Sequence, residues 1–180
     1  DVSAEQAGCR LRGLGSGLEI ASLAEARAVA STWPSHILAS MRKLIDPLPE
    51  PGTIALIEVF CGDGELSNAV ERFGGKAIRI GIKHSPEHDL TRPSVIRALI
   101  YLILYLEPLH VWIAWVCTSV AGFSALNYEK HEHLRAGIDA AGQNVKMWLQ
   151  MFRVIFHIQH SGHRGIHGEN PAKSLALQDP

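Results

Sequence analysis

The sequence of 180 residues is poor in cysteine and has almost no surplus charge. Its three cysteines, Cys9, Cys61 and Cys117, are far apart and odd in number. They do not form the pattern of a disulfide framework, so we expect a reducing intracellular compartment. The formal net charge is -1, which argues against strong nonspecific binding to nucleic acid, because phosphate binding needs an excess of Lys and Arg.

Long apolar stretches are also missing. The most apolar run, ALIYLILYL at residues 98–106, has nine residues and lies between Arg97 and Glu107, whereas a membrane-spanning helix needs about 20. The run that follows begins after Pro108 and contains His110, glycine, serine and threonine. We therefore expect a buried helix followed by a buried strand, and no membrane span. A membrane hairpin is the alternative that hydropathy leaves open.

A proline-rich segment, DPLPEPG at residues 46–52, divides the chain. Before it, the pattern predicts a helix over 18–30 and a shorter one over 35–45, with Pro34 between them because proline does not fit a helix interior. We interpret residues 1–52 as an N-terminal helical extension with its linker. Residues 53–180 form the expected α/β domain; it is short for a complete domain of this type, and a truncated domain is one interpretation of that length.

Strands and helices alternate after the linker. Apolar runs bounded by turn residues predict strands over 53–60, 76–82 and 109–116, with one more within 163–176. Three helices are expected between these strands. The first has an apolar face made of Leu66, Ala69, Val70 and Phe73, and Gly74 and Gly75 end it. The second covers 94–106 with Ser94 as its N-cap, and the third carries the apolar stripe Val145, Trp148, Leu149, Phe152, Ile155 and Phe156. This alternation predicts a Rossmann-like α/β fold with a parallel sheet.

The stretch EVFCGDGELSNAV, Glu58 to Val70, joins the first expected strand to a helix through a glycine turn. Ligands of such sheets bind beyond the carboxyl ends of the strands, where Gly62 and Gly64 allow the backbone to approach them. Glu58 and Asp63 can accept hydrogen bonds there from an amino group or a ribose. The same glycine spacing also occurs in strand-to-helix turns that bind no ligand and need glycine only for steric reasons. The third glycine of the dinucleotide-binding fingerprint is missing, which disfavours NAD and FAD.

Three further stretches follow in order: HDLT at 88–91, WVCTSVAGFS at 115–124 and ENPAKS at 169–174. Together with the glycine turn they resemble the S-adenosylmethionine-dependent methyltransferases, and within them the DNA cytosine-5 methyltransferases. The resemblance covers about residues 54–175 and implies the methyltransferase form of the Rossmann-like fold. It also implies S-adenosylmethionine as cofactor and a nucleic-acid cytosine as substrate.

The resemblance also implies roles for particular residues. Phe60, Gly62, Gly64 and Asp89 would line the cofactor, together with Glu58 and Asp63. The thiolate of Cys117 would add to C6 of the cytosine, and Glu169 with Asn170 would support the adduct. The target base would have to leave the duplex to reach such a site.

Two alternatives remain open. One is a catalytically inactive methyltransferase-like subunit that binds or supports a larger protein complex, because Trp115 and Val116 stand before Cys117 where the family has a proline, and no target-recognition region follows. In that case Cys117 is an inert buried thiol and residues 169–171 form a turn. The other is a small α/β protein that binds a different nucleotide.

Histidines are numerous, with ten in the chain, and His157, His160, His163 and His167 are close together in sequence. Short spacings of this kind occur in zinc sites, but no cysteine or carboxylate completes a known ligand pattern, so we expect no metal site. Trp112, Trp115 and Trp148 have core spacings and are expected to pack inside. Trp33, beside Pro34, is expected to anchor the N-terminal segment.

Overall fold

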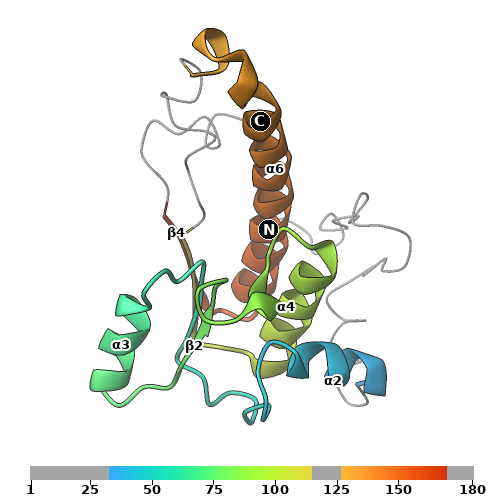
Figure 1. The fold of residues 1–180 in the computed structure, drawn as a ribbon. Coiled ribbons are helices and arrows are strands. Elements are labelled where there is room, and N and C mark those ends of the chain that lie inside the picture. The colour runs from blue at the N-terminus through green and yellow to red at the C-terminus, as the bar shows by residue number, and fades with distance from the viewer. Residues whose placement is uncertain (1–32, 115–126, 170–180) are drawn as a thin grey trace, which may run out of the picture.

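The computed structural model describes residues 33–114 and 127–169 (Figure 1). The expected helix over 18–30 and the part of the third strand beyond 114 lie outside them. The elements are, in chain order, α2 (Ser35–Arg42), β1 (Leu56–Val59), α3 (Glu65–Arg72), β2 (Ala77–Ile80), the short 3-10 helix η2 (Pro86–His88), α4 (Pro93–Leu106), β3 (His110–Ile113), α6 (Glu132–Ser161) and β4 (Gly165–Gly168). Each of the four expected strands is present in part.

The four strands form one parallel sheet in the order β2-β1-β3-β4. Glu58 of β1 pairs with Arg79 of β2 on one side and with Trp112 of β3 on the other, and Trp112 pairs with His167 of β4. A helix connects each strand to the next, as parallel pairing requires. The predicted α/β fold with a parallel sheet is confirmed, and its topology is compatible with a Rossmann-like domain.

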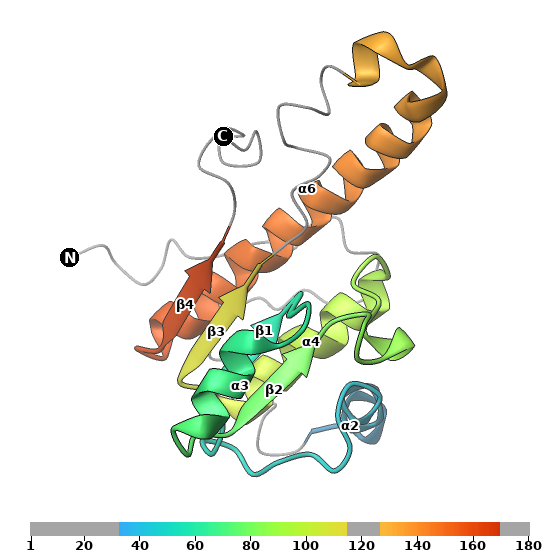
Figure 2. The ribbon, with the colours of Figure 1, turned by 60° about the vertical axis from the view of Figure 1, so that its left-hand side comes forward.

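The helices lie on both faces of the sheet. Helix α3 covers β1 and β2 on one face, while α4 and α6 pack together on the other (Figures 1 and 2). All four residues of β1 are buried because the strand is central and has helices on both sides. This explains why its sequence is a near-continuous apolar run rather than an alternating one.

Helix α4 is the centre of the hydrophobic core. Nine of its residues are buried: Val95, Ile96, Ala98, Leu99, Ile100, Tyr101, Leu102, Ile103 and Leu106. Helix α2 packs on it and contributes Met41 to the same core. Helix α4 is 14 residues long. Within the described part of the chain, no helix has the length and apolar character to cross a membrane.

Trp33 takes part in this packing. Its ring lies edge-on to Tyr101 and Tyr105, with ring centroids 5.9 and 6.2 Å apart. Residues after it continue the contact, since Gly52 donates a backbone hydrogen bond to the carbonyl of Leu106. The segment that the sequence assigned to an extension and linker therefore shares the core of the α/β body from Trp33 onward.

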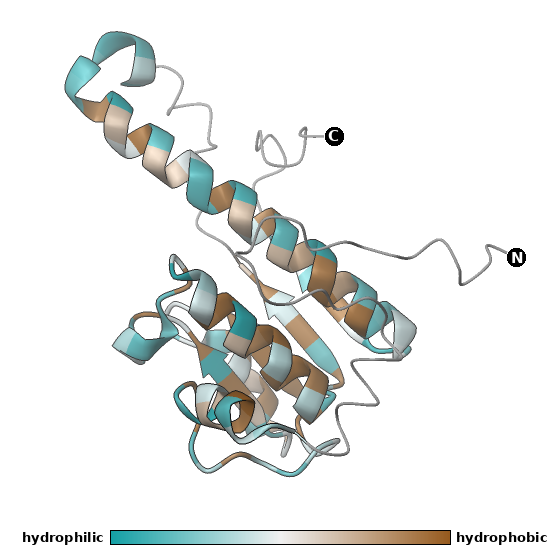
Figure 3. Cartoon of the chain, turned by 90° about the vertical axis from the view of Figure 1, so that its right-hand side faces the viewer, coloured by the Kyte–Doolittle hydropathy of each residue, from teal (hydrophilic) through white to brown (hydrophobic). Residues whose placement is uncertain are grey.

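Helix α6 is longer than its apolar stripe. It has 30 residues, and its buried side chains are confined to Val145 and the positions after it. Figure 3 shows hydrophobic residues concentrated along the part of this helix that lies on the body, while the outward end is largely hydrophilic. Phe156, expected on the buried stripe, is 42% exposed and stacks on His160 instead.

The structure corrects two predictions about helix ends, the N-cap of α4 and the place of Phe73 at the end of α3. Helix α4 begins at Pro93, with Arg92 rather than Ser94 as its N-cap, because proline has no N–H to leave unpaired at the first helical position. Helix α3 ends at Arg72, and Phe73, expected on its packed face, is 94% exposed. Gly74 has a φ of 82°, so the helix ends there and the chain turns back to enter β2 at Ala77, as the glycine pair predicted.

The core position of Leu99 predicts a large loss of stability on truncation. Leu99 is completely buried, whereas Leu109 is 58% exposed. Leu99→Ala should lower the free energy of unfolding by about 2–5 kcal/mol, because it leaves a cavity in the core. The matched change Leu109→Ala should alter it by no more than about 0.5 kcal/mol. Urea unfolding measures both, and equal losses would contradict this assignment of the core.

Candidate functional site

The turn after β1 has an unusual backbone. Phe60, Gly62 and Gly64 have positive φ values of 59°, 54° and 74°. Glycine adopts this region freely, but it is an outlier for a bulky side chain such as Phe60. Phe60 still donates its backbone N–H to the carbonyl of Ile80, at 2.8 Å. The turn directs its ring against Trp148 of α6, edge-on, with ring centroids 4.9 Å apart.

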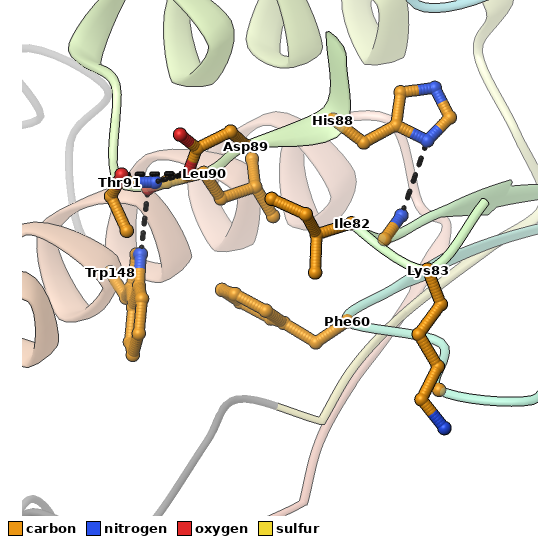
Figure 4. A pocket seen from close by; sticks show the side chains of 10 residues that line it. Phe60, Ile82, Lys83, His88, Asp89, Leu90, Thr91 and Trp148 are labelled. Atoms are coloured by element: carbon orange, nitrogen blue, oxygen red, sulfur yellow. Dashed lines mark hydrogen bonds between the residues drawn. The ribbon is translucent and has the colours of Figure 1, made fainter. Parts of the chain in front are cut away.

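A cavity of about 300 Å³ opens beside this ring, beyond the carboxyl ends of β1 and β2 (Figure 4). Its lining residues come from the loops after both strands, from η2 and its following turn, and from α6: Phe60, Gly62, Gly81, Ile82, Lys83, His88, Asp89, Leu90, Thr91 and Trp148. The volume is at the lower end of the range of small-molecule sites, about 300–1,000 Å³. The position is the one at which open parallel sheets bind ligands.

Asp89 is the carboxylate of the cavity. Its Oδ1 accepts hydrogen bonds from the backbone N–H of Thr91 at 3.1 Å and from the Thr91 hydroxyl at 2.6 Å. These bonds hold the pKa of Asp89 below its usual value, with a smaller contribution from the nearby Arg92. The group is therefore ionised at neutral pH, and it can accept further hydrogen bonds from a ligand.

Two fixed side chains complete the walls. The indole of Trp148 donates from Nε1 to the carbonyl of Leu90, at 2.8 Å, which sets the orientation of its ring. His88 accepts at Nδ1 from the backbone N–H of Gly81, so its proton is on Nε2, which is 2.8 Å from the carbonyl of Leu44. Both nitrogens of His88 are thus used to connect the end of β2 with the segment after α2, and this ring is a structural wall.

Lys83 and Asp63 form an ion pair between the loops that follow β2 and β1, with Nζ 2.8 Å from Oδ1. The hydrogen bond between them lowers the pKa of Asp63 and raises the pKa of Lys83. Both side chains are largely exposed, and such pairs contribute little to stability. Their effect is local, because each charge neutralises the other at the rim of the cavity.

Glu58 points away from the cavity, toward α3. Its buried carboxylate accepts from the backbone N–H of Ser67 at 2.8 Å and from the Ser67 hydroxyl at 2.5 Å. Gly64 lies at the same junction, where a Cβ atom would meet the Arg79 side chain at 2.7 Å. Of the six residues expected at the cofactor, Phe60, Gly62 and Asp89 line the cavity, whereas Glu58, Asp63 and Gly64 shape the loop that borders it.

The residues expected to carry the chemistry are only partly described. Cys117 and Asn170 lie outside the described residues. Glu169 is exposed and follows β4 directly, and its backbone N–H donates to the carbonyl of Ile113, at 2.9 Å. Ile113 ends β3, four positions before Cys117 in sequence. The pairing of β3 with β4 therefore brings Glu169 to the strand from which the Cys117 segment departs.

Sequence reasoning missed the apolar lining of the cavity. Trp148 belongs to the packing stripe of α6, and nothing in its spacing distinguished a cavity wall from a core residue. The HDLT stretch was a usable signal, since all four of its residues line the cavity. Among residues 33–114 and 127–169, no three histidine, cysteine, aspartate or glutamate side chains are grouped so as to hold a metal ion.

No protein-family model, curated protein or solved structure matches this chain. The interpretation of the cavity therefore depends on its own geometry and on the motif resemblance.

The Glu58–Ser67 contact predicts a stability defect. Glu58→Ala should lower the free energy of unfolding by about 1–3 kcal/mol, because both donors of Ser67 lose their buried acceptor. Ser67→Ala should cost less, since its backbone N–H keeps Glu58 as partner. Glu50→Ala, at an exposed position, is the control and should change stability by no more than about 0.5 kcal/mol. Urea unfolding would refute the contact if all three variants were equally stable.

Cys61 should be unreactive in the folded protein. Burial raises the pKa of its thiol from 9.0 to about 11, and the charge of Glu58 adds to this. The shift lowers the thiolate fraction near pH 8 roughly a hundredfold, and the thiolate is the reactive form.

A variant with Cys61 as its only cysteine, made by Cys9→Ser and Cys117→Ser, tests this. Its reaction with a thiol reagent at pH 8 should be slow until guanidinium is added. Adding Gln150→Cys, at an exposed position of α6, should supply one thiol that reacts at once. Rapid labelling of Cys61 in the native protein would show that its environment is open and polar.

Proposed function

We propose that this chain is a methyltransferase-like domain whose cavity binds S-adenosylmethionine, with a nucleic-acid cytosine as the substrate class. One observation carries the proposal. Phe60, Gly62 and Asp89, taken from two separate motifs of the resemblance, line a single cavity at the carboxyl ends of the strands. The pairing of β1 with β2 makes the loops after them neighbours, but Asp89 lies nine positions beyond the end of β2.

The lining suits an adenosine group. Phe60, Ile82, Leu90 and Trp148 provide apolar surface for a purine. Asp89 provides an ionised carboxylate that can accept hydrogen bonds from an amino group. The bound cofactor would also carry a positive sulfonium, and a negative charge in the cavity favours such a ligand.

The chemical step would depend on two other residues. The cofactor, when bound, supplies an electrophilic methyl group. Cys117 would add to C6 of the cytosine and leave again when the proton at C5 is lost, and Glu169 would donate a hydrogen bond to the base while the adduct exists. Glu169 has its backbone fixed beside the end of β3, and that strand ends four positions before Cys117 in the sequence.

The alternative is a catalytically inactive methyltransferase-like subunit of a larger complex. It is favoured by Lys83 at the end of the second strand, where the family has an acid for the cofactor ribose, and by Val116 before Cys117. In this version the cavity can still bind the cofactor, but no methyl group is transferred.

Calorimetric titration with S-adenosylmethionine is the first test. The unchanged chain should bind it, and Phe60→Ala and Asp89→Ala should each weaken binding about tenfold or more, since the loss of an apolar wall or of a hydrogen bond to a charged group costs about 1.5–3 kcal/mol. Phe73→Ala, at a fully exposed aromatic outside the cavity, should bind like the unchanged chain. Equal weakening by all three variants, or no binding at all, would overturn the proposed cofactor.

An assay for transfer of a labelled methyl group to DNA or RNA then distinguishes the active methyltransferase from the inactive subunit. Transfer that Cys117→Ser abolishes, with cofactor binding retained, supports the enzyme. Binding without transfer to any nucleic acid supports the inactive subunit.

A further inference from the structure

A group of rings lies over β3 and β4, on the face of the sheet that carries α3. Trp112 and His167 are in register with Glu58, whose side chain contacts α3. Residues in register across a sheet point to the same face, and so do residues two positions apart in one strand. His110 therefore shares this face, and among the described elements only α3 packs on it, over β1 and β2.

The two imidazoles meet across the β3–β4 pair. Nδ1 of His110 is 3.3 Å from Nε2 of His167, and both side chains are exposed. Gly165, the partner of His110 in the ladder, makes this possible, because a Cβ atom there would overlap the imidazole of His110. Trp112 stacks on the ring of His167, with ring centroids 5.3 Å apart and planes 26° apart. The ring of His167 thus lies between those of Trp112 and His110.

We propose that His110 and His167 form a binding site for a zinc-type divalent cation. In a tetrahedral zinc site with Zn–N bonds of about 2.0–2.1 Å, two ligating nitrogens are about 3.4 Å apart. The observed distance matches this value and is also within the range of a direct hydrogen bond between the two rings. One cation would use the lone pairs of both rings at once, whereas a direct hydrogen bond uses only one.

The cation class follows from the ligands. Imidazole nitrogen suits zinc, copper and nickel rather than magnesium or calcium, which prefer oxygen. No third histidine, cysteine or carboxylate of the described residues joins the pair, so water completes the coordination. An exposed site with two protein ligands binds reversibly, and it is independent of the cofactor cavity, which is lined by other residues.

The cation would join β4 to the rest of the sheet. β4 has four residues and lies at the edge of the described sheet, and the two histidines are 57 positions apart in the sequence. A ligand that binds the folded chain and not the unfolded chain raises its stability. With zinc at about 100 times its dissociation constant, the melting temperature should rise by roughly 5–11 °C.

Titration of a tag-free chain with zinc chloride tests the proposal. Calorimetry should detect one zinc site in the unchanged chain. His110→Ala and His167→Ala should each weaken zinc binding tenfold or more, and zinc should no longer raise the melting temperature of either variant. His84→Ala and His157→Ala, at exposed histidines elsewhere, should leave the zinc affinity and the rise in melting temperature unchanged. Cobalt in place of zinc should give the strong visible absorption of a tetrahedral complex in the unchanged chain and not in the two site variants.

The result is decisive in either direction, because the site residues are exposed and their loss should not unfold the chain; circular dichroism without metal checks this. Binding that survives in the double variant, or a zinc effect that His84→Ala or His157→Ala removes, would overturn the proposal. So would the absence of zinc binding by the unchanged chain.

Discussion

The buried carboxylate of Glu58 sets the geometry on which the cavity depends. A charged group inside a protein must be hydrogen-bonded, and Glu58 obtains two donors from Ser67. This fixes the first turn of α3 above the end of β1. The chain then has only the residues from Phe60 to Gly64 in which to leave the sheet and enter the helix. Positive φ at three alternate positions is the consequence.

The strained backbone at Phe60 has a structural benefit. Along a regular strand, Phe60 would point to the same face as Glu58, toward α3. Its positive φ reverses this, and the ring instead meets Trp148 of α6 on the other face. Strain of this kind persists only where the surrounding packing compensates for it. Here the compensation is the contact of two aromatic rings, with Trp148 itself held by the carbonyl of Leu90.

These details separate what the sequence could predict from what it could not. The apolar run of β1 and the alternation after it predicted the parallel sheet, because both follow from local periodicity. The family resemblance placed Phe60, Gly62 and Asp89 around one cofactor; the three line one cavity, and the cofactor itself stays a prediction. The direction of Glu58 could not be predicted, since it depends on a partner nine positions away whose hydroxyl looked like an ordinary helix residue.

Other misses have the same origin. Periodicity placed Phe73 on the packed face of α3, but the helix ends one residue earlier and the side chain is exposed at the turn that leads into β2. Its prediction that Trp148 belongs to the core is confirmed, but it could not show that the same ring also lines the cavity. The contact of His110 with His167 was invisible because it depends on strand order and on the missing side chain of Gly165.

The charges around the cavity bear on which ligand it prefers. Lys83 lines it, but its ammonium group is paired with Asp63 at the rim, and Oδ2 of Asp89 is 3.7 Å from Nε of Arg92, so neither charge is isolated. A dinucleotide would bring a pyrophosphate, which needs cations or free helix-terminal amides. A ligand with an amino group and a positive sulfonium would instead meet a carboxylate already ionised by its hydrogen bonds with Thr91. The lining thus offers a pyrophosphate no unpaired ammonium or guanidinium group, and the proposed adenosyl sulfonium needs none.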